Sequence, residues 1–509
     1  MISASNKLIG ALALTAAAIS GLTQLSSAQS SGAGPSSSQP PYVVPTISGV
    51  LTRSILTVGD AVNNKPDGTP YRMVGIPDGL GAFDNGDGTF TVLMNHEIPE
   101  GLGAIRAHGS KGAFVSKWIV RKSDLTVLGG SDVMQQIATW NPLTGSFNAL
   151  AAGVPIGRLC SADLPAASAF YNAATRRGYN AGRIYMNGEE VGAEGRAFAH
   201  VVNGPHGGAT YELPYLGKFS WENSVAHPAT GNKTVVVGTD DATPGQVYVY
   251  VGNKTNTGNP IKRAGLGDGK LYGIRVAGVA AESRETGIAS GTAFDLYNFG
   301  TVAYKTGAEL EEQSDAHGVT EFLRPEDGAW DPQQPNHFYF ATTDRFDQVK
   351  AGVGEAVGRS RLWRLRFIDA ARPTLGGQID MLLDGTEAHQ SLDNLTIRRG
   401  QVFMQEDPGN NVHLGKLWRY DIAGDALRLI AQHDPNRFVA GAPNFITEDE
   451  ESSGIIDVSE ILGAGWYLLD VQAHNRNTDI DGDGDIDAVD EELVEGGQLL
   501  VLKHPERRR

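Results

Sequence analysis

Short hydrophobic runs recur along the chain, and each of them ends in a cluster of polar or acidic residues. A turn follows each cluster, and then a second short strand with an apolar or aromatic centre. Short apolar runs bounded by turn residues predict β-hairpins. The expected strand pairs are 90–94 with 118–120, 184–186 with 197–199, 235–237 with 247–250, 338–340 with 362–365, 402–404 with 417–420, and 466–469 with 499–501.

The number and spacing of these hairpins favour an all-β fold, namely a six-bladed β-propeller with insertions. A β-sandwich would have fewer and more even repeats. The 64 glycines agree with a turn-rich chain. Because equivalent turns of a propeller converge at one end of its axis, we expect the acidic clusters to meet there. Surface carboxylates that favour turns for local hydrogen bonding are the alternative for any single cluster.

The N-terminal segment predicts export. Lys7 precedes the apolar run 8–18, and Ser26-Ser27-Ala28 is a small-x-small cleavage pattern, so 1–28 is expected to be a signal peptide cleaved after Ala28. Residues 29–45 are rich in Ser, Gly and Pro and are expected to form a flexible lead-in. The rest, 46–509, is expected to be one propeller domain in the periplasm or outside the cell. We expect no integral membrane segment, because no second long apolar run follows.

Charge limits the partners. The chain has 59 acidic and 42 basic side chains and a formal net charge of −17. Nucleic acid is therefore not an expected partner, because phosphate backbones select basic surfaces. We expect a monomer that acts on a small molecule.

A calcium loop is the most specific local motif. Asp479, Asp481, Asp483, Gly484, Asp485 and Asp490 occupy positions 1, 3, 5, 6, 7 and 12 of such a loop, within an insertion at 475–492. Oxygens at these positions satisfy the six to eight ligands that Ca²⁺ prefers, and glycine at position 6 allows the sharp turn. The loop is similar to dockerin-like repeats and is expected to pin an insertion between the last two strands. A solvated acidic turn is the alternative.

Two further features carry candidate chemistry. Cys160 is the only cysteine, so no intramolecular disulfide can form, and its residue type fits a small buried hydrophobe. Arg324 stands two residues before Glu326. A guanidinium beside a carboxylate suits an oxyanion and a metal ion, although an ion pair at a strand corner fits the same residues.

In order along the chain, several segments resemble the PhoX-type alkaline phosphatases, of which this sequence would be a divergent member. They are Asn95-His96-Glu97, Cys160, Glu189-Glu190, Gly217 to Glu222, Gly238 to Asp241, Arg324-Pro325-Glu326, Asp393-Asn394, Gln405-Glu406-Asp407 and Trp466 to Asp470. The likeness spans most of the expected mature chain.

That resemblance implies an exported enzyme that hydrolyses phosphate monoesters with an Fe³⁺ and Ca²⁺ cluster on the axis, in a phosphate-scavenging role. It makes Cys160 an iron ligand, Arg324 the phosphate-binding donor, and Arg324 with Glu326 the catalytic pair. The carboxylates expected to hold metal are Glu189, Glu190, Glu222, Asp240, Glu326 and Glu406.

Three departures from the family pattern stand out. The N-terminus lacks a twin-arginine pair, the glycines usual after the cysteine are absent around Cys160, and Trp221 stands where a histidine is usual. Other readings of the same scaffold therefore stay open. One is another calcium-dependent propeller hydrolase, such as a phosphodiesterase, a phytase-like enzyme or a lactonase. The other is a non-catalytic, calcium-stabilised surface module.

Overall fold

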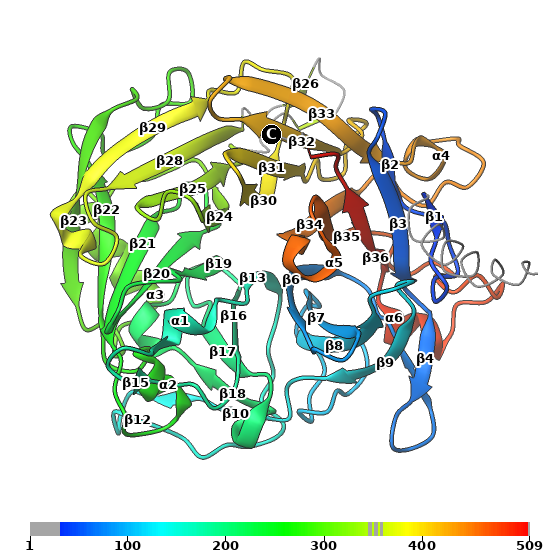
Figure 1. The fold of residues 1–509 in the computed structure, drawn as a ribbon, viewed down its shortest axis with the longest axis horizontal. Coiled ribbons are helices and arrows are strands. Elements are labelled where there is room, and N and C mark those ends of the chain that lie inside the picture. The colour runs from blue at the N-terminus through cyan, green and yellow to red at the C-terminus, as the bar shows by residue number, and fades with distance from the viewer. Residues whose placement is uncertain (1–30, 345–348, 351–354, 357–359, 507–509) are drawn as a thin grey trace, which may run out of the picture.

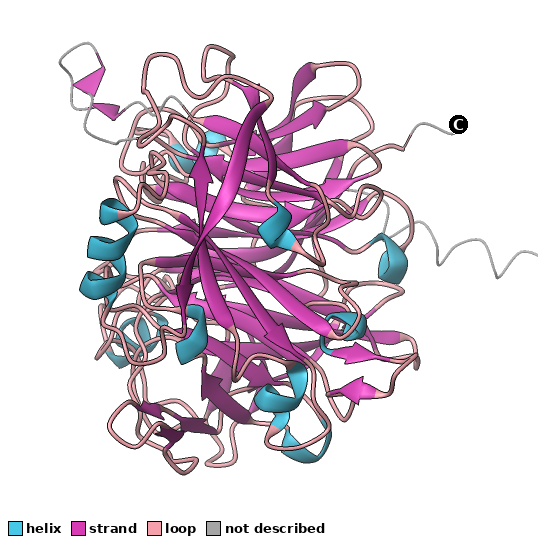
Figure 2. Ribbon diagram, turned by 90° about the vertical axis from the view of Figure 1, so that its left-hand side faces the viewer, coloured by secondary structure: helices cyan, strands magenta, loops and turns pink. Residues whose placement is uncertain are grey.

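The chain folds into four-stranded antiparallel units arranged around a central axis (Figure 1). The structure is a computed structural model, and it describes residues 31–344, 349–350, 355–356 and 360–506. The expected signal peptide lies outside these residues. Helices in the described part are short and lie at the periphery of the strands (Figure 2).

Six innermost strands, counted in the described part of the chain, surround the axis. They are β6 (Pro77–Asp84), β13 (Leu159–Asp163), β19 (Trp221–Ala226), β24 (Pro325–Trp330), β30 (Leu392–Arg398) and β34 (Glu450–Asp457). Each of these inner strands contacts the next along the chain, and β34 returns to β6. The closed ring makes the all-β fold β-propeller-like.

The second and third strands of each unit are the hairpins predicted from the sequence, and each pair is antiparallel. They are β7 (Thr89–His96) with β8 (Phe114–Arg121), β16 (Ile184–Glu189) with β17 (Ala197–Val201), β20 (Lys233–Asp240) with β21 (Val247–Asn253), β25 (His337–Thr342) with β28 (Arg361–Phe367), β31 (Gln401–Glu406) with β32 (Lys416–Asp421), and β35 (Trp466–Ala473) with β36 (Gly496–Lys503). Their apolar residues pack between neighbouring units as the core.

Outer strands complete the units. They are β9 (Val127–Asp132), β10 (Gln136–Ala138), β18 (Ala209–Glu212), β22 (Lys270–Val276), β23 (Thr292–Gly300), β29 (Gly377–Leu383) and β33 (Ala426–His433). The N-terminal β3 (Leu51–Thr57) pairs with β36, so the two ends of the chain close one sheet. The antiparallel pairing of β23 with β29 joins two units at their outer edges.

The remaining elements lie in connections. The helices are α1 (Ala167–Phe170), α2 (Pro260–Ala264), α3 (Gly307–Ala316), α4 (Pro435–Phe438), α5 (Ser459–Leu462) and α6 (Ala488–Leu493), with 3₁₀ turns at Gly204–His206, Pro214–Leu216 and Pro373–Leu375. Small hairpins pair β4 (Ala61–Asn64) with β5 (Pro70–Arg72), β11 (Trp140–Asn141) with β12 (Ser146–Phe147), β14 (Tyr171–Asn172) with β15 (Arg177–Gly178), and β26 (Val349–Lys350) with β27 (Glu355–Ala356).

The segment expected to be a flexible lead-in is part of the sheets from residue 31 onward. Within it, β1 (Gly32–Ala33) pairs with β3, and β2 (Val43–Pro45) pairs with β33. Val43 is fully buried, and the Tyr42 amide donates to the Gln498 side chain at 2.7 Å. Backbone pairing with two sheet edges therefore orders a segment that buries few apolar side chains.

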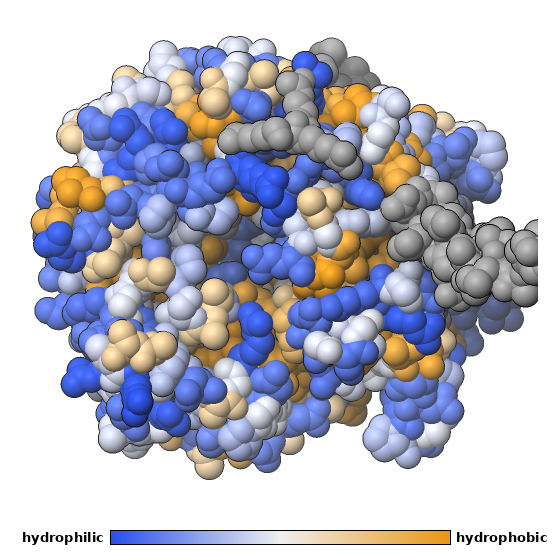
Figure 3. Space-filling model, in the orientation of Figure 1, coloured by the Kyte–Doolittle hydropathy of each residue, from blue (hydrophilic) through white to orange (hydrophobic). Residues whose placement is uncertain are grey.

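A cavity of about 220 Å³ opens on the axis, lined by the later residues of the inner strands and by residues 164–166 before α1. Hydrophobic residues gather near the middle of the face seen in Figure 3, among mostly hydrophilic ones. Asp163 and Asp327 are the ionisable side chains that line this cavity. Burial raises the pKa of Asp163 to about 7 and that of Asp327 to about 6.

Candidate metal centre

Acidic side chains converge at the start of the inner strands from one repeated position. In every unit the second residue of the inner strand belongs to this set, which we call the inner ring: Asp78, Cys160, Glu222, Glu326, Asp393 and Glu451. In five of the six inner strands the pairing register shifts at or next to this residue, as a β-bulge does, and in β34 it shifts a few residues later, between Ser453 and Ile456. Bulges re-aim side chains, so the distortion accompanies the turn of these groups toward the axis.

A second set comes from the residue directly after the second strand of each unit. We call it the turn ring: Glu97, Glu190, Asp241, Thr343, Asp407 and His474. The last residue of each second strand pairs with the first residue of the inner strand, as Asp240 does with Trp221. The residue that follows therefore lies beside the inner ring.

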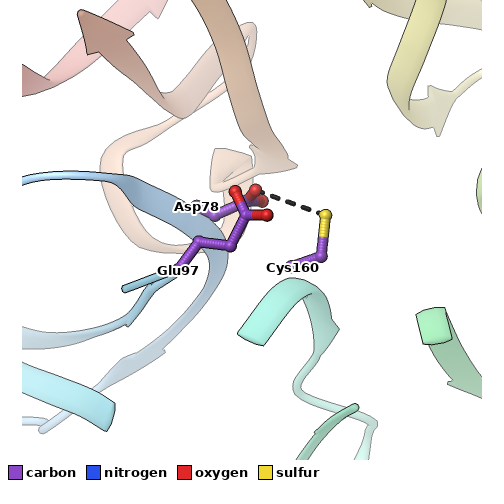
Figure 4. A group of neighbouring side chains, drawn as sticks. All are labelled: Asp78, Glu97 and Cys160. Atoms are coloured by element: carbon purple, nitrogen blue, oxygen red, sulfur yellow. Dashed lines mark hydrogen bonds between the residues drawn. The ribbon is translucent and has the colours of Figure 1, made fainter. Parts of the chain in front are cut away.

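The two rings combine into three groups whose ligand atoms lie within 4.8 Å of one another in each group. They are Asp78 with Glu97 and Cys160, Glu222 with Asp241 and Glu326, and Asp393 with Asp407 and Glu451. Figure 4 shows Asp78 and Glu97 pointing toward the sulfur of Cys160. Cys160 Sγ donates to Glu222 Oε2 at 3.0 Å and to Asp78 Oδ2 at 3.5 Å, which joins the first group to the second.

Hydrogen bonds hold the groups in place. Gln472 Nε2 donates to Asp78 at 3.0 Å and to Glu97 and Glu451 at 3.2 Å each, which links the first and third groups. Thr343 Oγ1 donates to Glu326. His474 Nδ1 lies 2.5 Å from Glu495 Oε2 and its Nε2 lies 4.0 Å from Glu451 Oε2, so Glu451 also has an imidazole beside it.

Two arginines stand at the edge of the groups. Arg324 contacts Asp241 through two nitrogens, at 2.5 and 2.9 Å, and its Nε lies 3.5 Å from Glu326. Arg158 Nη2 lies 2.5 Å from both Glu97 and Glu190. These are charge-assisted contacts of the kind that fix carboxylate geometry.

Bound cations would stabilise the buried carboxylates of the two rings. Burial raises the pKa of Asp78, Glu222, Glu326 and Asp393, and repulsion from neighbouring carboxylates adds to it in each case. Burial and the carboxylates of Asp78 and Glu222 also raise the pKa of the Cys160 thiol.

Among the described residues, Glu222 Oε1 and both Asp470 oxygens are buried without a hydrogen-bond partner. Buried carboxylates of this kind coordinate metal ions or remain protonated. The donor set of oxygens and one sulfur fits hard cations together with a metal that accepts thiolate.

The structure brings together most of the predicted site residues. Cys160, Glu190, Glu222 and Glu326 lie in the rings, with Arg324 beside them. Three predicted ligands face other partners. Glu189 pairs with Arg196 at 2.6 Å, Asp240 Oδ1 accepts from the Ser220 amide at 3.1 Å, and Glu406 accepts from Trp418 Nε1 at 2.8 Å. The physical reason is the alternation of side chains along a strand, because each is the last strand residue and the next residue is the one in the ring.

The sequence interpretation did not include Asp78, Glu97, Asp241, Asp393, Asp407 and Glu451 as ligands. Asp241 and Asp407 directly follow Asp240 and Glu406, so strand parity was the signal that could have found them. Asp78 and Glu451 are the second residues of strands that lack an apolar run and gave no strand signal.

The residues of the predicted calcium loop lie between β35 and β36, apart from the two rings. Asp479, Asp481 and Asp483 offer oxygens within 4.8 Å of one another. Asp490 is part of the capping box of α6 and accepts from the Ile480 amide at 2.7 Å. The Asp485 side chain is exposed and is not in the group.

The fold and site together define a β-propeller-like protein with a buried acidic candidate metal site on its axis. Residues 209–427 match the family described as alkaline phosphatase PhoX. The resemblance predicted from the sequence is therefore confirmed over this part of the chain, which is similar to the PhoX alkaline phosphatases, and the protein is a metal-dependent phosphatase.

One solved structure supports the fold. The Pseudomonas fluorescens PhoX structure, solved in complex with vanadate, a transition state analogue, aligns over 94% of this chain and 98% of its own, with a TM-score of 0.56 and 12% identity. A puromycin-hydrolysing peptidase of Mycobacterium tuberculosis aligns with a TM-score of 0.31 and 10% identity, over 88% of this chain and 59% of its own. No curated protein matches the sequence. No helix in the described part is long and apolar enough to cross a membrane.

Proposed function

We propose that this phosphatase hydrolyses phosphate monoesters at the two rings and serves to scavenge phosphate. The observation that carries the proposal is the convergence of one acidic or thiol residue from every unit onto a single axial site, with Arg324 at its edge. The repeated positions also support the proposal that the units are six blades of one propeller.

The metal assignment follows from donor chemistry. The group with Cys160 would hold iron, because thiolate favours a softer metal than oxygen donors do. The all-oxygen group of Asp393, Asp407 and Glu451 would hold Ca²⁺, and the group of Glu222, Asp241 and Glu326 would contribute to the same cluster. Such ions, when bound, polarise a phosphoryl group and supply an activated oxygen nucleophile.

The residues of the chain would position the substrate. Arg324 presents a planar fork of donors suited to two phosphoryl oxygens, and Asp241 fixes the direction of that fork. Glu326 lies beside the fork. The Thr343 hydroxyl donates to the Glu326 carboxylate, so the orientation of Glu326 is set before substrate arrives. Preorganised donors of this kind stabilise charge that develops in the transition state.

The proposal extends to the location and the oligomeric state of the protein. Export by way of the N-terminal segment, action in the periplasm or the medium, and a monomeric state agree with its net charge of −17 and its sequence pattern. Calcium in the loop around Asp479, Asp481 and Asp483 would stabilise the connection between β35 and β36.

Elemental analysis of the purified protein, run beside hydrolysis of a generic aryl phosphate with and without chelator, tests the proposal. We expect iron and several calcium ions per chain, and turnover that chelator abolishes. Turnover of a phosphate diester but not of the monoester would replace the substrate class. Calcium alone, with no turnover of either ester, would contradict both the iron assignment and monoester hydrolysis.

A further inference from the structure

Arg158 occupies the position in its unit that Arg324 occupies two units further along the chain. Each arginine directly precedes an inner strand, Arg158 before β13 and Arg324 before β24. Both have a positive φ, 35° for Arg158 and 66° for Arg324. Non-glycine residues rarely adopt this conformation, and when they do they often lie at functional sites.

The ion pairs of the two arginines are equivalent as well. Arg324 contacts Asp241, which follows the second strand of the preceding unit, β20. Arg158 contacts Glu97, which follows the second strand of its own preceding unit, β7. Both contacts measure 2.5 Å. The repeated fold thus places a guanidinium against the turn ring at two points.

The two arginines flank one continuous acidic site. Arg158 stands beside the group with Cys160, and Arg324 beside the group with Glu222. The 3.0 Å contact between Cys160 and Glu222 joins these groups.

Arg158 is the more accessible of the two. Its side chain is 44% exposed, against 23% for Arg324. Both of its carboxylate contacts use Nη2, while a guanidinium carries five N–H donors in all. A positive group with this exposure, at the edge of a site for phosphate, suits an anion that approaches from solvent.

We propose that Arg158 is a specificity-determining residue that binds a second anionic group of the substrate, so that the enzyme prefers phosphate monoesters carrying a further carboxylate or phosphate. This inference rests on the proposed monoesterase function, in which Arg324 receives the phosphoryl group that is cleaved. Arg158 then holds the leaving-group portion at the neighbouring edge of the site.

The test compares two ligands with the same phosphonate, one with a free carboxylate and one in which a methyl ester removes that second charge. Binding of 3-phosphonopropionate and of its carboxyl methyl ester, neither of which can be hydrolysed, is measured by calorimetry on the metal-loaded protein. We expect the wild type to bind the acid about tenfold or more tightly than the ester, because hydrogen bonds to charged groups contribute more than neutral ones. Arg158→Gln should remove this preference, and Arg158→Lys should retain part of it.

A remote arginine serves as the matched control. Arg275 pairs with Asp295 at 2.7 Å and is 42% exposed, so Arg275→Gln removes a similar surface ion pair far from the rings and should leave the preference intact. The kinetic test uses a carboxyalkyl phosphate and its methyl ester. Arg158→Gln should raise KM for the acid about tenfold more than KM for the ester, while kcat changes to a similar extent for both substrates.

Several results would overturn the inference: no preference in the wild type, an unchanged preference in Arg158→Gln, or an equal loss of both ligands in that variant. An absence of turnover with every phosphate monoester would instead reject the proposed function. The binding comparison would still decide the role of Arg158 in that case, because it needs no hydrolysis.

Discussion

Cys160 Sγ lies 3.0 Å from Glu222 Oε2, although 62 residues separate the two along the chain. Both are the second residue of an inner strand, β13 and β19 respectively. The contact is therefore a product of the repeated fold, because neighbouring units place the same strand position against the axis.

Replacing Cys160 with serine should lower the iron content of the purified protein by about one ion per chain without unfolding the protein. A hydroxyl of similar size fills the space but does not ionise to a soft ligand as a thiol does. Elemental analysis measures the metal, and circular dichroism follows the fold. Unchanged iron together with unchanged activity would rule out a ligand role for Cys160.

Adjacent aspartates offer a sharper comparison. Asp241→Asn should lower kcat/KM for an aryl phosphate on the order of 10²-fold, because Asp241 both belongs to the second group and orients Arg324. Asp240→Asn should stay within a few-fold of wild type, since Asp240 accepts from the Ser220 amide and an amide oxygen can do the same. If the two variants lose activity equally, the turn ring is not the functional set.

This pair shows how far sequence alone could reach. The apolar runs fixed the hairpins, and the acidic residues after them indicated a common site. Whether Asp240 or Asp241 faces the axis depends on the residue at which β20 ends, and one residue of uncertainty inverts the answer. The inner strands themselves were beyond prediction, because β6 begins Pro-Asp-Gly and β34 begins Glu-Glu, so the chemistry of the site replaces the apolar pattern of a strand.

The calcium loop should stabilise the fold without taking part in catalysis. Asp479→Asn combined with Asp481→Asn should reduce the rise in melting temperature that millimolar Ca²⁺ produces. When the free Ca²⁺ concentration is 100 times the Kd, binding adds about 2.7 kcal/mol to the free energy of unfolding. Asp485→Asn is the control, because its side chain is outside the group. Phosphatase activity should change little in either variant, and identical calcium-dependent melting of double variant and wild type would refute an occupied loop.

Asp163 should make stability depend on pH. Burial raises its pKa to about 7, so between pH 4 and pH 7 the folded state binds more protons at this group than the unfolded state. The stability that this group contributes is therefore greatest below about pH 4, falls as pH rises toward the folded pKa of about 7, and is lost above it. Asp163→Asn removes the charge while its amide oxygen can still accept from the Ala226 amide, which now donates to Oδ2 at 3.1 Å.

We expect the stability of Asp163→Asn, measured relative to wild type, to be greater at pH 8 than at pH 5 by on the order of 1–3 kcal/mol. The side chain of Asp163 faces a cavity, which limits the size of this effect. Urea midpoints at the two pH values give the difference. Asp87→Asn, on an exposed turn where hydrogen bonds from Thr89 lower the pKa, should show no such change between pH 5 and pH 8. If the stability difference between wild type and Asp163→Asn is the same at pH 5 and at pH 8, Asp163 ionises in the folded protein as readily as in the unfolded chain.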